Sequence, residues 1–419
     1  MTKGRYTNKM IVLLCTVAYF VSYFSRKTFS VMMVEMTTNA QVIERDVASL
    51  VAGALFVTYG IGQLVSGYLG DRISPKYLMF TGIMVSALCN LLVPLVNQYV
   101  LIFIWAVNGF AQALLWPPIV RILAENLSRE KYVTANLIVT CGAHVSTIVL
   151  YVYAPICIKL MSWRAVYFSS AIVSAVVGII FIASMCFVLR GREERVKEKT
   201  NEIKRKEGLM KAFSQSGIIF IFVSIVAMGF MRDGIESWLP TLYCEAFNKS
   251  SEEAILLSVF IPIFAIISLF VVRIIHKHRM FNNEASGAYI LFFISVILCL
   301  LVTFLISISE VWARITCLIL LALASACMHS INFLLISCLP GRFASSGRSA
   351  TIGGACNACT YVGAAGSMYG IEVISYHLGW QATTSTWIGV CAVGALFAIL
   401  ALKKYSNFIK KENKIPTLK

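Results

Sequence analysis

The sequence predicts an all-α membrane protein of twelve transmembrane helices, arranged as two pseudo-symmetric six-helix bundles. Of the 419 residues, 58% are hydrophobic, and the mean hydropathy is +0.79. Charged residues make up 13% of the chain, against about 25% in soluble domains. The apolar runs reach the roughly 20 residues that a helix needs to cross a bilayer. They lack the ten-residue alternation that is typical of an outer-membrane barrel.

The twelve helices are separated by short loops and by one long charged segment. Pro155, Pro240 and Pro262 fall inside or near the ends of spans, where neighbouring helices or a cavity can satisfy the freed backbone groups. We expect an N-terminal bundle over 1–189, a cytoplasmic charged linker over 190–213, and a C-terminal bundle with a basic tail over 214–419. The predicted spans are 9–34, 47–70, 77–97, 99–124, 133–160, 163–189, 214–244, 252–275, 286–308, 311–338, 347–374 and 380–403.

Charge on the loops predicts the orientation of the chain. The side that holds both termini carries 27 of the 36 Lys and Arg residues, and the opposite side carries five. Because basic loops stay in the cytoplasm, both termini are expected there, most simply at a bacterial inner membrane. The net charge of +16 is therefore interpreted as orientation charge and not as a nucleic-acid signal. The linker is either a solvated segment or a site for anionic lipid headgroups.

Several function classes find no support in the sequence. The thirteen cysteines fall mostly inside apolar helices, where Cys behaves as a small hydrophobic residue. Their spacing suggests neither a metal site nor a disulfide framework. No nucleotide-binding loop or nucleophile triad is found, so an enzyme is not expected, nor is a cofactor. The first apolar run is too long for a cleavable signal peptide, and Arg26-Lys27 interrupts it.

Two arginines lie in the middle of predicted spans, Arg26 in the first and Arg232 in the seventh. Each costs about 2.5–3.5 kcal/mol at a helix centre, so each is expected to face a wet cavity or a counter-charge. The seventh helix is the first helix of the second half, and matching positions in two halves are typical of a symmetric transporter. Tyr19, Tyr23 and Arg26 share one helical face, with Lys27 about 100° away. This pattern favours an anion site; the alternative is that Arg26 reaches outward to an interface.

Two further polar residues sit in predicted spans. Arg232 and Glu236 are spaced i, i+4 and can pair. Glu236 either neutralises Arg232 permanently or exchanges with a bound anion. His144, in the fifth span, is either a hydrogen-bonded packing residue or a contact sensitive to protons or phosphate.

The loop after the second span reads Gly67-Tyr68-Leu69-Gly70-Asp71-Arg72-Ile73-Ser74-Pro75-Lys76. This pattern resembles the signature loop of the major facilitator superfamily. The twelve helices in two groups of six and the long middle loop agree with that resemblance. It implies the major facilitator fold and a cytoplasmic conformational latch made by Gly67, Asp71 and Arg72.

Three motifs resemble the organophosphate:phosphate antiporter family within that superfamily. The first span carries Tyr23-Phe24-Ser25-Arg26-Lys27-Thr28-Phe29, similar to the family's Tyr-x-x-Arg-Lys-x-Phe. The fourth carries Asn108-Gly109-Phe110-Ala111-Gln112 followed by Trp116-Pro117-Pro118. The seventh matches through Arg232, Gly234, Trp238, Pro240 and Thr241, and Ala143-His144 resembles the family's fifth-span Ala-His pair.

The resemblance implies exchange of a phosphorylated metabolite for inorganic phosphate by alternating access, in a protein expected to be monomeric and surrounded by membrane lipids. It departs from the glycerol-phosphate members at Gln63, where they have a lysine, and at Ser330, where they have a tyrosine. A proton-coupled organic-anion symporter and a transporter-like sugar-phosphate sensor are the alternatives. The substrate-binding residues expected by this resemblance are Arg26, Arg232, His144, Tyr19, Tyr23, Tyr361, Lys27, Glu236, Gln63 and Trp116.

Overall fold

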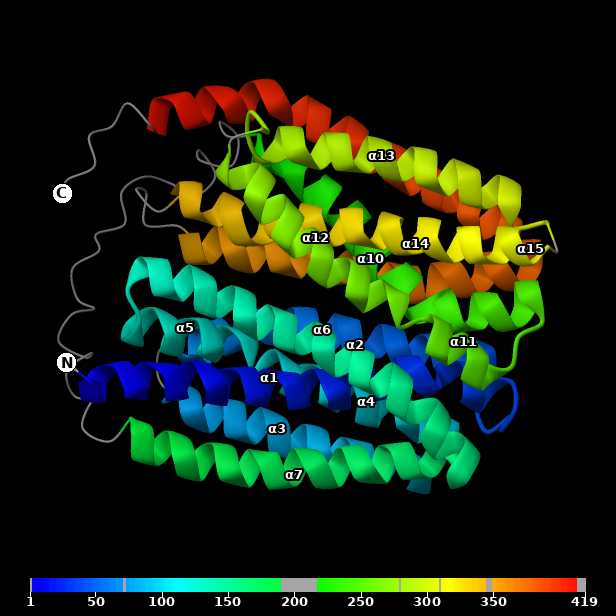
Figure 1. Ribbon diagram of the computed structural model, residues 1–419, viewed down its shortest axis with the longest axis horizontal. Coiled ribbons are helices and arrows are strands. Elements are labelled where there is room, and N and C mark those ends of the chain that lie inside the picture. The colour runs from blue at the N-terminus through cyan, green and yellow to red at the C-terminus, as the bar shows by residue number, and fades with distance from the viewer. Residues whose placement is uncertain are drawn as a thin grey trace. The chain divides into compact units, whose positions relative to one another are not determined.

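A computed structural model describes residues 2–70, 73–189, 217–278, 280–308, 310–343 and 349–412. Within these ranges the chain is helical and forms no strand (Figure 1). Contacts divide the chain into two compact units. The N-terminal unit is Met1–Glu202 together with Lys249–Pro262, and the C-terminal unit is Ile203–Asn248 together with Ile263–Lys419.

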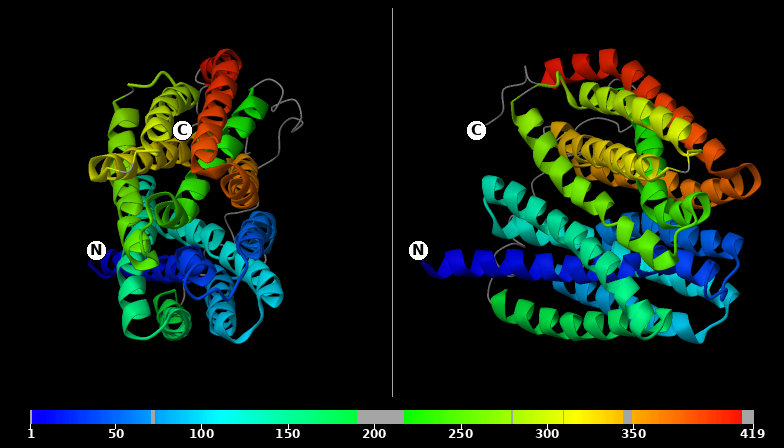
Figure 2. Two further views of the ribbon diagram at one scale, coloured as in Figure 1. Left: turned by 90° about the vertical axis from the view of Figure 1, so that its right-hand side faces the viewer. Right: turned by 45° about the vertical axis from the view of Figure 1, so that its right-hand side comes forward.

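The N-terminal unit is built around α1, which packs mainly on α6 and α7, while α2 packs mainly on α4. In both views of Figure 2, α1 and α7 run side by side. Ser250 caps the short helix α11, which packs on α6. The helices of this unit are α1 (Thr2–Thr37), α2 (Arg45–Gly70), α3 (Pro75–Leu92), the short η1 (Val93–Leu95), α4 (Gln98–Ala113), α5 (Trp116–Asn126), α6 (Arg129–Leu160), α7 (Trp163–Val188) and α11 (Ser251–Leu257).

In the C-terminal unit, α10 and α15 form the most extensive contact. Gly379, with a φ of 80°, interrupts α15 and divides it into two helices. The elements of this unit are α10 (Ile218–Phe247), α12 (Phe260–Lys277), α13 (Glu284–Leu305), α14 (Val311–Asn332), the π-helical turn η3 (Phe333–Cys338), η4 (Leu339–Phe343) and α15 (Ser349–Glu412).

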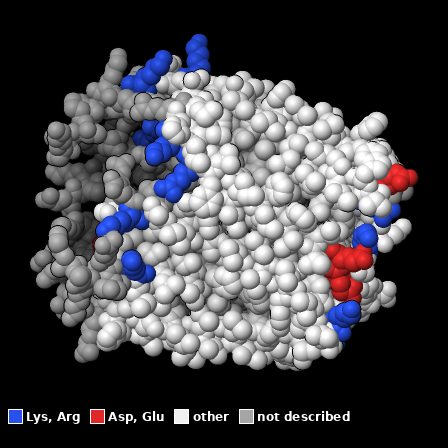
Figure 3. Space-filling view, viewed as in Figure 1, with Lys and Arg blue, Asp and Glu red and all other residues white. Residues whose placement is uncertain are grey.

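The predicted all-α membrane fold is confirmed. Eleven helices of the described chain are long and apolar enough to cross a membrane, and the last of them, Ile352–Lys410, contains the interruption at Gly379. Counting its two parts separately gives the twelve predicted spans. On the face drawn in Figure 3, Lys, Arg, Asp and Glu gather near the helix ends, and the surface over the helix middles is uncharged.

Two predicted spans are broken where the sequence analysis expected continuous helices. The span 99–124 is divided between α4 and α5 at Leu114–Leu115, directly before Trp116-Pro117-Pro118. The span 252–275 is divided between α11 and α12 at Ser258–Val259, three residues before Pro262. Proline lacks the N–H that an upstream carbonyl needs, and its ring disfavours helical geometry before it. Both breaks therefore follow from the prolines.

The predicted ends of the first and last spans were too short. Helix α1 begins at Thr2 instead of residue 9, and α15 continues to Glu412 instead of residue 403. Hydropathy marks only the part of a helix that lies in hydrocarbon, whereas backbone hydrogen bonding continues into the polar flanks. The added turns at the end of α15 are held by packing, because Phe408 stacks on Phe343 with ring centroids 4.7 Å apart.

Candidate functional site

Helix α1 places Arg26 against aromatic rings inside the N-terminal unit. Its guanidinium carbon lies 4.3 Å from the ring centroid of Tyr59, 5.5 Å from that of Tyr23 and 5.7 Å from that of Phe56. The residue is 5% exposed. Ring faces carry a partial negative charge that attracts a cation within about 6 Å, and the attraction strengthens when water is excluded. The aromatic cradle therefore holds a buried cation with groups that carry no formal charge.

The other predicted residues of α1 lie close by. Tyr19 packs edge-on against Tyr23 at 4.9 Å between ring centroids and against Trp116 of α5 at 5.1 Å. Lys27 follows Arg26 and is 4% exposed. The structure thus brings Tyr19, Tyr23, Arg26 and Trp116 into one continuous set of contacts. Phe56 and Tyr59 of α2 were missed by the sequence analysis, since no spacing rule relates them to Arg26.

Gln63 and His144 are buried residues of the same unit. Gln63 lies one turn after Tyr59 on α2 and is 7% exposed. His144 of α6 is also 7% exposed, and its neighbour Ala143 belongs to the apolar cluster that contains Tyr19. Both residues therefore occupy helices whose buried faces meet the surroundings of Arg26.

In the C-terminal unit, Arg232 of α10 is held by two partners. Its Nη2 forms an ion pair with Asp233 Oδ2 at 2.6 Å, and its Nη1 donates to Asn332 Oδ1 of α14 at 2.8 Å. Glu236 was the partner expected from helical spacing, and it lies one turn farther along α10, buried and 6% exposed. The carboxylate that pairs with Arg232 in these contacts is that of its immediate neighbour.

Tyr361 lies on the first part of α15, which packs along α10. It is 7% exposed. Glu372, about three turns farther along α15, is a further buried carboxylate of this unit and was not singled out from the sequence. Carboxylates inside a span are costly and are typically functional or paired.

The close approach of α10 and α15 depends on glycine. A Cβ atom on Gly229 would overlap the backbone of Thr360, and one on Gly363 would overlap the backbone carbonyl of Val226. Small residues let two helix backbones come together where lipid gives no hydrophobic driving force. These two glycines therefore allow the close approach of α10, which carries Arg232, and α15, which carries Tyr361.

The predicted latch is described in part. Gly67 lies in the last turn of α2, and Asp71 and Arg72 lie outside the described residues.

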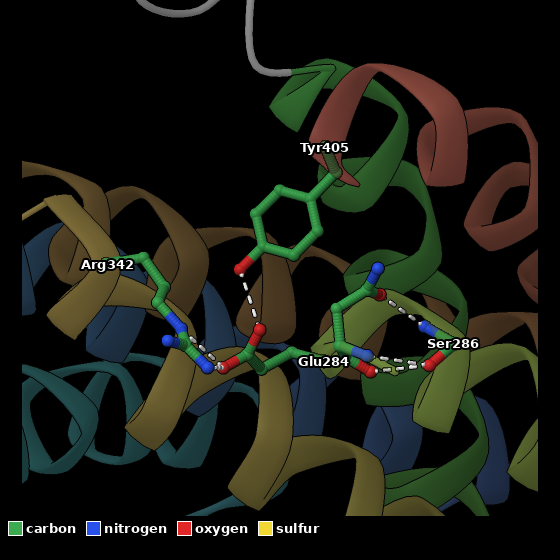
Figure 4. Close-up of polar contacts among 5 residues, drawn as sticks. Glu284, Ser286, Arg342 and Tyr405 are labelled. Carbon is green, nitrogen blue, oxygen red and sulfur yellow. Dashed lines mark hydrogen bonds and ion pairs between the residues drawn. The ribbon is translucent and has the colours of Figure 1, made fainter. Parts of the chain in front are cut away.

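The C-terminal unit holds a charge cluster that the sequence analysis missed (Figure 4). There Glu284, 1% exposed, accepts a hydrogen bond from Arg342 Nε at 2.8 Å and another from Tyr405 Oη at 3.0 Å. Asn283 caps the same end of α13 through Ser286.

Each unit thus buries one arginine on its first long helix, and the contacts described for the two arginines differ. Aromatic faces surround Arg26, whereas a carboxylate and an amide hold Arg232. A guanidinium presents a planar fork of N–H donors that fits carboxylate and phosphate oxygens. Within the described residues, no group of His, Cys, Asp and Glu side chains has the arrangement of a metal site. The guanidinium groups of Arg26 and Arg232 are the functional groups of this site that are suited to an anion.

Comparison with solved structures supports the fold. The chain superposes with a TM-score of 0.69 on a bacterial homolog of the human lysosomal transporter Spinster, in its inward-facing and unoccupied conformation. The match covers 98% of this chain and 99% of that chain, at 12% sequence identity. Identity at this level shows the fold alone.

Curated relatives include transporters of phosphorylated compounds. A probable hexose phosphate transport protein of Chlamydia muridarum is 28% identical over 165 residues, which is 39% of this chain and 36% of that protein. The glycerol-3-phosphate transporter of Bacillus subtilis is 26% identical over 309 residues, covering 69% of each chain. The membrane sensor protein UhpC of Escherichia coli is 28% identical over 195 residues, 45% of this chain and 42% of that one.

The first of these matches spans little more than a third of the relative's length. The names of the relatives agree with the resemblance to the organophosphate:phosphate antiporter family seen in the sequence motifs. The fold and the relatives are those of transport proteins and not of enzymes, as expected, in a membrane protein of several spans. The model of the Major Facilitator Superfamily matches residues 15–368, and the chain therefore belongs to this superfamily.

Proposed function

We propose that this protein exchanges a phosphorylated organic metabolite for inorganic phosphate by alternating access. The observation that carries the proposal is the pair of buried arginines, Arg26 and Arg232, on the first long helix of each unit. Each is 9% exposed or less. A buried cation is costly in a membrane and marks a substrate pathway unless it is purely structural. Relatives that carry hexose phosphate and glycerol 3-phosphate support a phosphorylated substrate.

The two arginines are proposed to act in turn. Arg26 lies against the ring faces of Tyr59, Tyr23 and Phe56, and its guanidinium would offer an incoming dianion a charged group with several N–H donors. At Arg232 the anion has to compete with Asp233. Substrate would then replace Asp233 at Arg232, so the guanidinium would exchange one anion for another, whereas in the empty protein the same step would break the ion pair with no anion to replace Asp233. Since a ligand shifts an equilibrium by its differential affinity for two states, the loaded carrier would cross more readily than the empty one.

The remaining predicted residues are proposed to line the same pathway. Tyr19, Tyr23 and Trp116 extend the aromatic surface beside Arg26, while Lys27 and His144 add donors. Gln63 would contribute a neutral amide where the glycerol-phosphate members have a lysine. An amide donates to and accepts from hydroxyl groups, which would favour a substrate with more hydroxyl groups than glycerol 3-phosphate. Glu236 and Tyr361 would serve the C-terminal unit. Gly67, Asp71 and Arg72 are proposed to form the cytoplasmic latch.

We place the protein in a bacterial inner membrane, as a monomer with both termini in the cytoplasm. Loop charge carries this orientation, because basic loops remain on the cytoplasmic side. The division into bundles 1–189 and 214–419, joined by the charged linker 190–213, is proposed to provide two bodies that move during transport.

A second candidate is a sensor that binds a sugar phosphate and transports it slowly. The similarity to the membrane sensor protein UhpC favours this alternative. A sensor and an antiporter can share the two arginines, so the distinction is one of turnover and not of binding.

The test uses purified protein in liposomes preloaded with inorganic phosphate, with uptake of radiolabelled phosphate as the measurement. Exchange in the unsubstituted protein that Arg26→Ala and Arg232→Ala both abolish supports the antiporter. Arg164→Ala is the matched control, since Arg164 is exposed and stacks on Trp163. Binding of a sugar phosphate without exchange would favour the sensor, and uptake that follows a pH gradient without internal phosphate would favour the proton-coupled symporter.

A further inference from the structure

A continuous hydrogen-bond network joins α1, α3 and α4 beside Arg26. Ser86 Oγ donates to Asn108 Oδ1 at 2.7 Å and accepts from Gln112 Nε2 at 2.7 Å. It also lies 2.8 Å from Ser25 Oγ. Because the single proton of Ser86 goes to Asn108, the proton in the remaining contact has to come from Ser25. Ser86 therefore makes all three of its hydrogen bonds, one donated and two accepted.

The network continues at both ends. Ser25 Oγ accepts from Asn90 Nδ2 at 2.7 Å, and Asn90 Nδ2 also reaches the Ser25 carbonyl oxygen at 3.2 Å. Ser22 Oγ donates to Gln112 Oε1. Ser22, Ser25, Asn90 and Gln112 are each 3% exposed or less, so water does not compete for these bonds. Asn90 Oδ1 and Asn108 Nδ2 are buried and have no hydrogen-bond partner among the described residues, so the network is incomplete at these two amides. The bonds that are made link α1 to α3 and α4 away from water, where each is strengthened by the low local dielectric.

The network fixes the axial position and the rotation of α1 relative to α3 and α4, and thereby the place of Arg26. Ser25 directly precedes Arg26, and Ser22 lies one turn before it. Residues on a helix rise 1.5 Å and turn about 100° each. A shift of α1 by one residue would therefore separate both serines from their partners on α3 and α4.

The aromatic cradle of Arg26 is attached to the same helix, α4. A Cβ atom on Gly109 would overlap the carbonyl oxygen of Leu55 and the hydroxyl of Thr58 on α2. Thr58 Oγ1 also donates to the carbonyl oxygen of Ala106 at 2.6 Å. Phe56 and Tyr59, which lie next to these α2 residues, provide two of the ring faces that contact Arg26. Helix α4 thus aligns the arginine through its amides and the rings through its glycine.

We propose that Asn108 and Gln112, acting through Ser86, are positioning residues that hold Arg26 against Tyr59 and Phe56 for anion binding. The role in anion binding rests on the proposed function, whereas the position of Arg26 does not. The residues do not contact the anion in this scheme. They determine where the guanidinium lies when the anion arrives, which is how a supporting set of hydrogen bonds gives a binding site its precision.

The first test measures the position of Arg26 without any substrate. Phenylglyoxal modifies accessible guanidinium groups, and peptide mass spectrometry gives separate rates for Arg26 and Arg232 in one molecule. Ser86→Ala should raise the rate at Arg26 several-fold and leave Arg232 unchanged, while Ser86→Thr, which keeps the hydroxyl, should restore the original rate. Ser22→Ala, which removes one end of the network, should give a smaller rise. Ser174→Ala on α7 is the matched control, because Ser174 is fully buried and its hydroxyl has no partner among the described residues.

The second test measures phosphate exchange in liposomes. Ser86→Ala should raise the KM for inorganic phosphate roughly tenfold, equivalent to about 1.4 kcal/mol. In an Arg26→Lys background the same substitution should have no further effect, since the network then has no guanidinium to align. Two independent losses would simply add.

The outcomes separate the inference from the proposed function. An unchanged rate at Arg26 in Ser86→Ala, or an equal rise at Arg26 and Arg232, would overturn the inference. So would additive losses in the Arg26→Lys background. Failure of the unsubstituted protein to exchange or bind phosphate would overturn the proposed function, and the labelling rates would still decide whether the network positions Arg26.

Discussion

Arg232 and Asp233 are neighbours in sequence, and their side chains form an ion pair of 2.6 Å. Successive residues on a helix point about 100° apart, so the arginine has to fold back along α10 to reach the carboxylate. Asn332 of α14 accepts from the second terminal nitrogen at 2.8 Å and holds the guanidinium in that position. The counter-charge of the second arginine therefore comes from its own helix, and its orientation comes from a helix far away in sequence.

This arrangement predicts that Asp233 competes with the substrate. Asp233→Asn removes the competing charge while keeping the shape, so the KM for inorganic phosphate should fall by up to about tenfold, or 1.4 kcal/mol. Asn332→Ala should raise the KM, because the Arg232 guanidinium loses the hydrogen bond that orients it. Radiolabelled phosphate exchange in liposomes provides both values. Asp46→Asn, at the exposed start of α2, is the control; a higher KM in Asp233→Asn would contradict the competition.

The fold was predictable because hydropathy reports directly on the membrane. Every predicted span has a helical counterpart. The errors in the predicted bounds lie where a proline or a polar helix end, and not hydropathy, decides where the helix stops. The prolines at Pro117, Pro118 and Pro262 break α4 from α5 and α11 from α12, although hydropathy continues through them. The polar ends of α1 and α15 extend beyond the hydrocarbon, where hydropathy gives no signal.

The site was predictable one helix at a time. Local spacing placed Tyr19, Tyr23 and Arg26 on one face, and these three lie together in the structure. The contacts that cross between helices had no local signal. Tyr59 against Arg26 and Asn332 against Arg232 both depend on tertiary packing, which no periodicity within one span encodes.

The close packing of α10 on α15 predicts that alanine substitutions at two glycines of α15 change the melting temperature very differently. Gly363→Ala places a Cβ atom against the backbone of Val226, which cannot move aside without separating the helices. Gly366→Ala meets nothing within 4 Å. We expect Gly363→Ala to lower the melting temperature in detergent strongly, or to prevent folding, and Gly366→Ala to leave it unchanged. Equal melting temperatures would show that the helices can separate at little cost.

The cluster in Figure 4 predicts that Arg342 stabilises the C-terminal unit through Glu284. Arg342→Met leaves a buried carboxylate with Tyr405 as its remaining partner in the cluster. The expected loss is about 1–3 kcal/mol, the usual penalty for a buried group that loses a hydrogen bond. Because Arg342 is 39% exposed, water moderates that loss. Glu284→Gln combined with Arg342→Met should recover part of the stability, since no uncompensated charge remains.

Thermal unfolding of the single and double variants in detergent measures this coupling. Glu284→Gln alone tests how far a neutral amide can replace the carboxylate. If the double variant is no more stable than Arg342→Met, the ion pair is not the source of the loss.

A buried carboxylate of α1, that of Glu35, contacts α11. Glu35 of α1 is 7% exposed and accepts from Ser251 Oγ and, at 2.7 Å, from Asn39 Nδ2. Ala254 and Ile255 of α11 are fully buried. The segment Lys249–Pro262 groups with the N-terminal unit although the chain on both sides of it belongs to the C-terminal unit. The hydrogen bond from Ser251 to Glu35 therefore adds to the packing on α6 that keeps this segment in the N-terminal unit.

Glu35→Ala should loosen this segment. The substitution removes the Glu35 acceptor and leaves Ser251 Oγ the longer contact to Glu252 Oε2 at 3.5 Å, a loss of about 1.4 kcal/mol that corresponds to amide exchange roughly tenfold faster in α11. Hydrogen exchange followed by mass spectrometry of the peptide over 249–262 measures it. Glu253→Gln is the matched control, because Glu253 pairs with Lys249 at the surface, where an ion pair contributes little. Exchange in α11 that Glu35→Ala leaves unchanged would mean that apolar packing alone retains the helix.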